Sequence, residues 1–188
     1  MRLFAGVMLA AEVRQRLGEQ IRARTARPGL DGLRWTADDK LHVTLQFFGS
    51  IALENLPALS AACAAAAQSP PRAFELRIQG AGAFPTARRA KILWLGISDG
   101  AAELEQLAEH LGRATQSLEL AKDEHAYTPH VTIARLTQPR NATALLQQLQ
   151  TCELTARVSG FSLVRSRLGA DARYEVLQDF ALLDRALV

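Results

Sequence analysis

The sequence has few of the residues that would indicate a disulfide-bonded, metal-binding or membrane-spanning protein. Its two cysteines, Cys63 and Cys152, lie far apart and in no spacing typical of a metal site. We expect both to be reduced, buried thiols in a cytoplasmic protein. No segment approaches the roughly 18 consecutive apolar residues of a membrane span, so no membrane partner is expected.

Lysine is also scarce, since only Lys40, Lys91 and Lys122 are lysines among the 22 basic residues. Arginine suits forked recognition of phosphate. An Arg- and Ala-rich chain is equally typical of a GC-rich genome, and we prefer that explanation here. The net charge of +3 is too small to establish a nucleic-acid partner.

The N-terminus has a short apolar run, residues 3–11, after Arg2, which resembles the core of a signal peptide. The run is short for that purpose, and residues 12–16 continue directly as an amphipathic helix. The pattern therefore favours a first strand over residues 3–9.

Hydrophobic periodicity predicts alternating strands and helices along the whole chain. The predicted strands are 3–9, 41–48, 74–78, 92–97, 130–135, 153–159, 161–167 and 173–183. The predicted helices are 10–26, 52–67, 101–119 and 142–150. A loop with a basic cluster is predicted after residue 78, from Gly80, Gly82 and Pro85 with Arg88, Arg89 and Lys91. The basic cluster could guide RNA, but a solubilising role is preferred.

Two stretches resemble one another, 88 residues apart: Leu-His-Val-Thr-Leu at 41–45 and Pro-His-Val-Thr-Ile at 129–133. Side chains alternate faces along a strand, so His42 and Thr44 share one face while Val43 packs in the core. His130 and Thr132 are related in the same way. Strand, helix, motif strand, helix and hairpin recur about twice, which predicts two α+β repeats that each contribute one motif strand.

Two imidazoles and two hydroxyls meeting in one cleft would suit the hydrolysis of a cyclic phosphodiester. One histidine can take a proton from water while the other protonates the departing ribose oxygen, because histidine titrates near neutral pH. Threonine hydroxyls on the same face can bind the non-bridging oxygens. This scheme requires no metal and no cofactor.

A purely structural role or a zinc site would account for the paired histidines less well. A single His-x-Thr strand usually has no function, but two copies in matching apolar context are improbable by chance. Zinc would need a third or fourth ligand. The remaining histidines do not supply one, because His110 is expected to be a solvated helix residue and His125 a polar loop residue, although His125 lies near the second motif.

These motifs resemble those of the two-histidine phosphoesterase superfamily, in particular the bacterial RNA 2′,3′-cyclic phosphodiesterases, also called the LigT-like or 2′-5′ RNA ligase family. The likeness covers nearly the whole chain. Besides the two motifs it includes the opening strand at 1–4, the central strand at 92–96, and a C-terminal hairpin with Ser166, Arg167, Leu168, Gly169 and Tyr174.

The resemblance implies an α+β fold of two pseudo-symmetric lobes, with antiparallel sheets lining a central cleft and helices outside, in a single bilobal domain over residues 1–188. It implies hydrolysis of an RNA 2′,3′-cyclic phosphate end to a 2′-phosphomonoester, and joining of RNA ends through a 2′-5′ bond as the reverse type of reaction. His42 would then be the acid and His130 the base, although the near-symmetric motifs leave this polarity open. Thr44 and Thr132 would bind phosphate, and the protein is expected to be a monomer.

The resemblance also implies that Phe47 and Arg135 hold the terminal base between them, as aromatic and guanidinium planes do with unpaired nucleotides. Strict strand alternation disagrees, because it places Phe48 and Ala134 on the histidine face instead. A bend would be needed, and a core role for Phe47 is an equal alternative. Two further functions stay open: an enzyme for another small cyclic phosphate, and an RNA-end-binding protein without catalysis.

Overall fold

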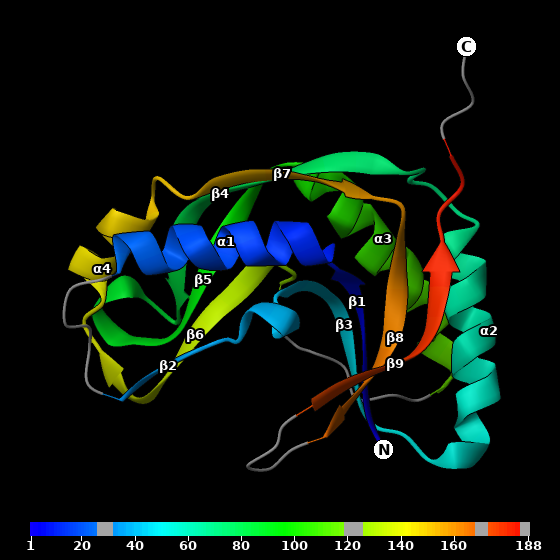
Figure 1. The fold of residues 1–188 in the computed structure, drawn as a ribbon. Helices are drawn as coiled ribbons and strands as arrows, with labels where there is room; N and C mark the ends of the chain where they lie inside the picture. The colour runs from blue at the N-terminus through cyan, green and yellow to red at the C-terminus, as the bar shows by residue number, and fades with distance from the viewer. Residues whose placement is uncertain (26–31, 119–125, 168–172, 185–188) are drawn as a thin grey trace.

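The residues that the structure describes form a curled sheet of nine antiparallel strands with four α-helices packed on it (Figure 1). This computed structural model describes residues 1–25, 32–118, 126–167 and 173–184. The strands are Arg2–Met8 (β1), Leu33–Trp35 (β2), His42–Ser50 (β3), Phe74–Phe84 (β4), Ala90–Asp99 (β5), His130–Arg140 (β6), Glu153–Val158 (β7), Gly160–Arg167 (β8) and Arg173–Ala181 (β9). The helices are Ala11–Arg24 (α1), Leu56–Ala67 (α2), Ala101–Ala114 (α3) and Thr143–Leu149 (α4), with 3₁₀ turns at Asp38–Lys40 (η1), Leu53–Asn55 (η2), Ala87–Arg89 (η3) and Gln116–Leu118 (η4).

The sheet has two halves of four strands that meet where β6 pairs with β3. Its order is β7-β4-β5-β6-β3-β1-β8-β9, and the short β2 pairs with β6 outside this path. The two motif strands are therefore the central neighbours of the sheet. They pair only around Val43 and Val131, and beyond that point β2 takes the place beside β6. The α+β class with antiparallel strands and outer helices, which the family resemblance implied, is confirmed, although the strands form one continuous curled sheet.

The repeats in the sequence do not coincide with the halves of the sheet. The C-terminal strands β8 and β9 complete the half that begins with β1, because β8 pairs with β1. The helices cross over as well: α1 follows β1 but packs on β7 and α4, whereas α3 follows β5 but packs on β3 and α2. The two repeats are thus interleaved, which periodicity along the sequence does not reveal.

The loop predicted after residue 78 is wrong in its first part, because β4 continues to Phe84. Gly80 has a φ of 81° and lies at a shift in the pairing of β4 with β5, between the pairs Ile78–Ile97 and Ala81–Leu95. A glycine in the left-handed region lets a strand bulge without ending. The glycine was interpreted as a strand terminator, whereas it bends a continuous strand.

The helix predicted at 101–119 ends earlier, at Ala114. The Thr115 hydroxyl donates to the Leu111 carbonyl oxygen, 2.8 Å away, and the chain continues as the 3₁₀ turn η4. The second motif strand is longer than predicted, since β6 reaches Arg140.

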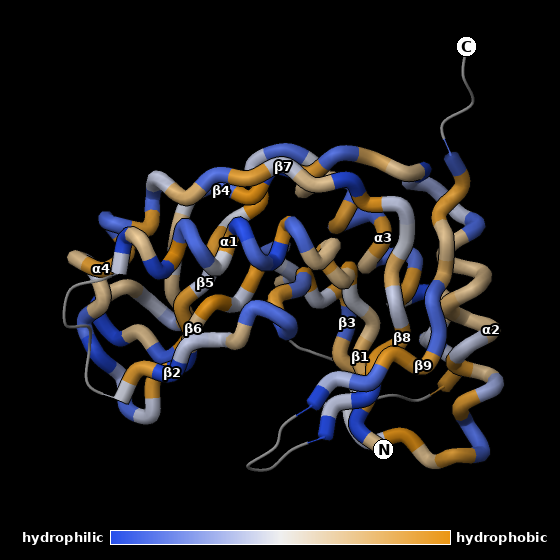
Figure 2. Tube along the Cα trace, viewed as in Figure 1, coloured by the Kyte–Doolittle hydropathy of each residue, from blue (hydrophilic) through white to orange (hydrophobic). Residues whose placement is uncertain are grey.

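Apolar side chains of both halves form one hydrophobic cluster between the helices and the sheet. In Figure 2 the hydrophobic colouring concentrates along the central strands, while the described ends of β8 and β9 are hydrophilic. Cys63 and Cys152 are free and buried, as predicted, and burial raises the pKa of the Cys63 thiol to about 12. None of the described helices is long and apolar enough to span a membrane.

Candidate active site

The junction of the two half-sheets brings both His-x-Thr motifs onto one face. Val43 and Val131 are opposite one another and fully buried on the core side. In an antiparallel pair centred there, the next residues face each other on the opposite side: His42 faces Thr132, and by the same register Thr44 faces His130. The two histidines are then diagonal neighbours, typically about 7–8 Å apart and somewhat closer between their Cβ atoms.

β3 has an irregularity immediately after its threonine. Its pairing with β1 passes from Gly6 opposite Thr44 to Ala5 opposite Gln46, so Leu45 is an extra residue without a partner. Such a bulge reverses the alternation of the side chains that follow it.

The same irregularity occurs at the equivalent place in β6. Its pairing with β5 passes from Trp94 opposite Thr132 to Leu93 opposite Ala134, which leaves Ile133 unpaired. The two motifs therefore match in their bulges as well as in their sequence, each one residue after the threonine.

The bulges explain why strict alternation gave the wrong faces. Beyond them, Phe47 lies opposite Phe4 and Arg135 opposite Ile92, on the histidine faces of their strands. Phe47 is 50% exposed and its ring centroid is 5.9 Å from that of Phe4, whereas Phe48 is buried at 1%. The expectation that Phe48 and Ala134 share the histidine face is wrong.

Backbone carbonyls fix the tautomer of both imidazoles. Nδ1 of His42 is 2.7 Å from the Lys40 carbonyl oxygen, and Nδ1 of His130 is 2.6 Å from that of Thr128. A carbonyl oxygen only accepts, so each Nδ1 carries the hydrogen and donates it. Nε2 of each ring is therefore the atom left to take or give a proton. The Thr44 hydroxyl, 3.0 Å from Nε2 of His42, donates to that nitrogen when the ring is neutral.

Each histidine lies against two aromatic rings, and sequence reasoning had not assigned these rings to the site. Phe4 and Tyr174 contact the His42 ring, with centroids 4.9 and 5.2 Å away. The corresponding rings at His130 are Phe84 and Trp94, with centroids 5.1 and 6.0 Å from its own. Phe4 and Trp94 come from the strands β1 and β5 that flank the motif strands, whereas Phe84 and Tyr174 come from the more distant strands β4 and β9, so only the arrangement of the sheet relates these rings to the motifs.

Burial among these rings lowers the pKa of both histidines, because desolvation disfavours the charged imidazolium. The carbonyl hydrogen bonds act against burial, and the positive charge of Arg135 lowers both pKa values further. The charge of His130 also lowers the pKa of His42. Two imidazoles that repel each other's protons favour a state in which only one is protonated, as paired acid and base catalysis requires.

Tyr127 attaches the segment that precedes His130 to β3, the strand that carries the first motif. Its hydroxyl donates to the Thr44 carbonyl oxygen, 3.0 Å away. Burial raises the pKa of Tyr127, and the charge of Glu105 raises it further, so the phenol stays protonated and can donate. The residues just before His130 are thereby attached to the strand that carries His42.

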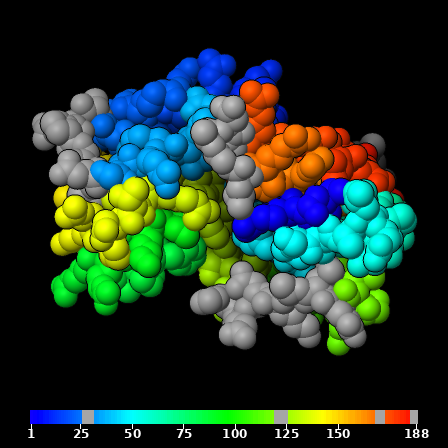
Figure 3. Space-filling view, turned by 90° about the horizontal axis from the view of Figure 1, so that it is seen from below, coloured from blue at the N-terminus to red at the C-terminus, as the bar shows by residue number. Residues whose placement is uncertain are grey.

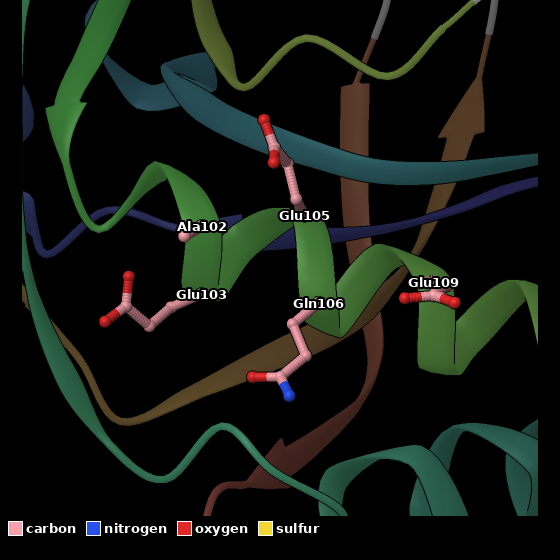
Figure 4. Close-up of a pocket in the computed structure, with 5 residues that line it drawn as sticks. All are labelled: Ala102, Glu103, Glu105, Gln106 and Glu109. Carbon is pink, nitrogen blue, oxygen red and sulfur yellow. The ribbon is translucent and has the colours of Figure 1, made fainter.

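The surface is hollowed between the two half-sheets, where yellow-green residues of β6 lie in a recess (Figure 3). Another depression of about 450 Å³ lies over the exposed side of α3 (Figure 4). It is lined by Ala102, Glu103, Glu105, Gln106 and Glu109. Its carboxylates would repel phosphate, so it is not the site for the chemistry of the histidines.

The remaining candidates from the sequence lie on other elements than the motif strands or outside the described residues. His110 is half-buried on α3, and His125 lies in a part of the chain that the structure does not describe. Arg88 and Arg89 are in η3 and Lys91 in β5. No group of three or more His, Cys, Asp or Glu side chains able to hold a metal ion occurs among the described residues.

One His-x-Thr strand on each side of a central antiparallel junction, within this α+β fold, defines the class of the two-histidine phosphoesterases. The chain belongs to the 2′-5′ RNA ligase superfamily, whose family model matches residues 11–170. The membership predicted from the motifs is confirmed.

Curated relatives carry the name RNA 2′,3′-cyclic phosphodiesterase. The protein of Aquifex aeolicus is 30% identical over 161 residues, which are 79% of this chain and 81% of that protein. The protein of Geobacillus stearothermophilus is 30% identical over 184 residues, which are 96% of this chain but 57% of that protein. The chain spans 65% of the Aeropyrum pernix relative, at 29% identity.

Solved structures share the fold over almost the entire chain. A protein of Thermus thermophilus is similar with a TM-score of 0.79 and 29% identity, over 99% of this chain and all of that one. Escherichia coli LigT, in its complex with 3′-AMP, is similar with a TM-score of 0.72 and 26% identity, over 96% and 97% of the two chains.

Proposed function

We propose that the protein hydrolyses the 2′,3′-cyclic phosphate at an RNA end to a 2′-phosphomonoester. One observation carries this proposal: two imidazoles from paired strands share one face, and each is held by a carbonyl so that Nε2 is its reactive atom. The names of the curated relatives support the substrate. The complex of E. coli LigT with 3′-AMP supports a nucleotide as the bound group.

The proposed reaction is an in-line displacement at phosphorus. Nε2 of His130 takes a proton from water as the oxygen attacks the phosphorus atom. The bond from phosphorus to O3′ breaks, and O3′ takes the proton from Nε2 of the His42 imidazolium, which leaves the phosphate on O2′. Nε2 of His42 must first release the Thr44 hydroxyl, which then donates to a non-bridging oxygen, as Thr132 does from the other strand.

This polarity has a structural reason behind it. Among the described residues, Nε2 of His130 has no hydrogen-bond partner and is free to receive water, whereas Nε2 of His42 already contacts Thr44. If the 5′-hydroxyl of a second RNA takes the place of water, attacks the cyclic phosphorus and expels O3′, the same groups would give a 2′-5′ bond and a free 3′-hydroxyl. Phe47 and Arg135, which approach from the two half-sheets, are proposed to hold the terminal base between them.

The central experiment uses a short RNA with a 2′,3′-cyclic phosphate end. We expect a product one water heavier whose phosphate is on O2′, as identified by phosphorus NMR against 2′- and 3′-phosphorylated standards. EDTA is expected to leave the rate unchanged, because the proton transfers are assigned to imidazoles. No product would refute the proposed activity, and a 3′-phosphate would refute the departure of O3′.

The pH optimum of kcat/KM is expected to lie below the ordinary histidine pKa of about 6.5. Turnover needs one neutral and one protonated imidazole, and the free protein lowers the pKa of both. As the pH rises, the acid therefore loses its proton earlier than an unperturbed histidine would. The kcat profile, which reports the complex, should move to higher pH because bound anionic phosphate favours the imidazolium. Rates measured across the range, in buffers of constant ionic strength, check both optima; a kcat/KM optimum on the alkaline side of neutrality would contradict the assignment.

A further inference from the structure

Arg34 lies directly opposite Arg135, where β2 pairs with β6 beyond the junction of the two motif strands. The strand β2 pairs with β6 so that Arg34 is opposite Arg135, while Leu33 is opposite Leu136. Opposite residues of an antiparallel pair share a face. Leu136 is buried on the core side, so the two arginines lie on the face that carries His130.

Two like charges directly opposite in a sheet are unfavourable unless something neutralises them. Both side chains are exposed, and neither has an acidic partner among the residues that the structure describes. Other described arginines do have acidic partners: Arg22 with Asp38, Arg77 with Asp99 and Glu153, Arg113 with Glu109, Arg157 with Glu75 and Asp184, and Arg165 and Arg167 with Glu175. Arg34 and Arg135 differ from the other unpaired arginines of the described chain in being directly opposite one another, so that a single anion can neutralise both charges.

The anion that suits the pair is not the reacting phosphate. Along β6 the order is His130, Thr132 and then Arg135, and five residues of strand extend at most about 16 Å. The two threonines already serve the reacting phosphorus. Arg34 is opposite Arg135 on β2, so an anion between the two guanidiniums lies at the level of Arg135, beyond the threonines that face the cyclic phosphate.

We propose that Arg34 and Arg135 together bind the phosphodiester on the 5′ side of the terminal nucleotide. This inference rests on the proposed function and adds a second phosphate subsite to it. A guanidinium donates through its edge, so Arg135 can stack its face on the base and still bind a phosphate oxygen. Arg34 has no base to hold and acts on the phosphate alone. The subsite would distinguish an RNA end from a cyclic mononucleotide.

The test compares two dinucleotides that both end in a 2′,3′-cyclic phosphate. One has an ordinary phosphodiester between its nucleosides and the other has an uncharged methylphosphonate. We expect wild-type protein to prefer the phosphodiester in kcat/KM, mainly through KM. Arg34→Ala should reduce this preference about tenfold, the scale of one lost charge-assisted interaction. Arg34→Lys, which keeps the charge but not the fork, should retain part of it.

The matched control is Arg16→Ala, an exposed arginine on α1 with no contact to the recess, which should keep the wild-type preference. Arg34→Gln is a second variant in case the alanine variant folds poorly, as checked by circular dichroism. If wild-type protein hydrolyses neither dinucleotide, the proposed function fails. If it hydrolyses both but Arg34→Ala keeps the preference, or loses equal activity on both substrates, the subsite is wrong while the proposed function stands.

Discussion

Replacing His42 or His130 with asparagine is expected to lower kcat about 10²–10⁴-fold in each case, the contribution of one general acid or base. Asparagine is chosen because its amide can still donate to the carbonyl of Lys40 or Thr128, so the strand ends keep their hydrogen bonds. The double variant should lose much less than the product of the two single losses, because residues that act as one unit are not additive. Initial rates on the cyclic RNA substrate measure all three.

His110→Asn is the matched control, because His110 is a half-buried residue of α3 and belongs to neither motif strand. It should keep wild-type kcat, and all variants should keep the wild-type unfolding midpoint within a few degrees. Full activity in His42→Asn or in His130→Asn would end the assignment of paired acid and base. Loss of folding in a variant would show instead that its histidine is structural.

A substrate with sulfur in place of the bridging O3′ separates the two roles. A thiolate departs without a proton from the enzyme, so the general acid is no longer needed. His42→Asn should then recover most of its loss, while His130→Asn should stay slow because water must still be activated. The opposite pattern would exchange the roles that are proposed for the two histidines.

The two histidines and two threonines of this site could be predicted because each His-Val-Thr motif is a short, continuous stretch of sequence. The order His-Val-Thr in an apolar strand places imidazole and hydroxyl on one face by alternation alone, and its second copy at 130–132 predicts a shared cleft. Helical periodicity likewise located all four α-helices of the described chain, with both ends within two residues for α1 and α4 but errors of four and five residues at one end of α2 and α3.

The rest depends on relations between strands that no local pattern carries. The unpaired Leu45 and Ile133 are ordinary aliphatic residues, so nothing in the sequence marks them as bulges, yet they turn Phe47 and Arg135 toward the histidines. Arg34 could not be predicted for a similar reason, because its importance arises only from the register of β2 on β6.

Glycine was the residue type most open to misinterpretation. In sequence, Gly82 suggested a loop, whereas in the structure it lies within β4, opposite Trp94, and the indole ring covers it. A Cβ atom built on Gly82 would be 2.2 Å from Cζ2 of Trp94. Because position 82 has no side chain, the Trp94 indole can pack against the backbone of β4 beside His130.

Gly82→Ala is therefore expected to damage both stability and turnover. A rigid ring cannot bend away from a methyl group, so the indole must move, and overpacking of this kind costs about 1–3 kcal/mol of unfolding free energy. The displaced ring would push on Phe84 and His130, whose centroids are 5.3 and 6.0 Å from that of Trp94. A catalytic group moved by about 1 Å can lose about 10²-fold in rate. Denaturant titration and initial rates measure the two effects.

Gly112→Ala makes the same chemical change where there is room for it. Gly112 is in α3, and nothing lies within 4 Å of a Cβ atom built there. Alanine favours a helix over glycine by up to about 1 kcal/mol, so this variant should be as stable as wild type or more stable, with unchanged kcat. If Gly82→Ala behaves like Gly112→Ala, the indole is not held against β4 and does not position the His130 ring. If Gly82→Ala lowers kcat under conditions in which the variant is fully folded, and leaves KM unchanged, then the packing of Trp94 on Gly82 helps to orient His130, the proposed general base.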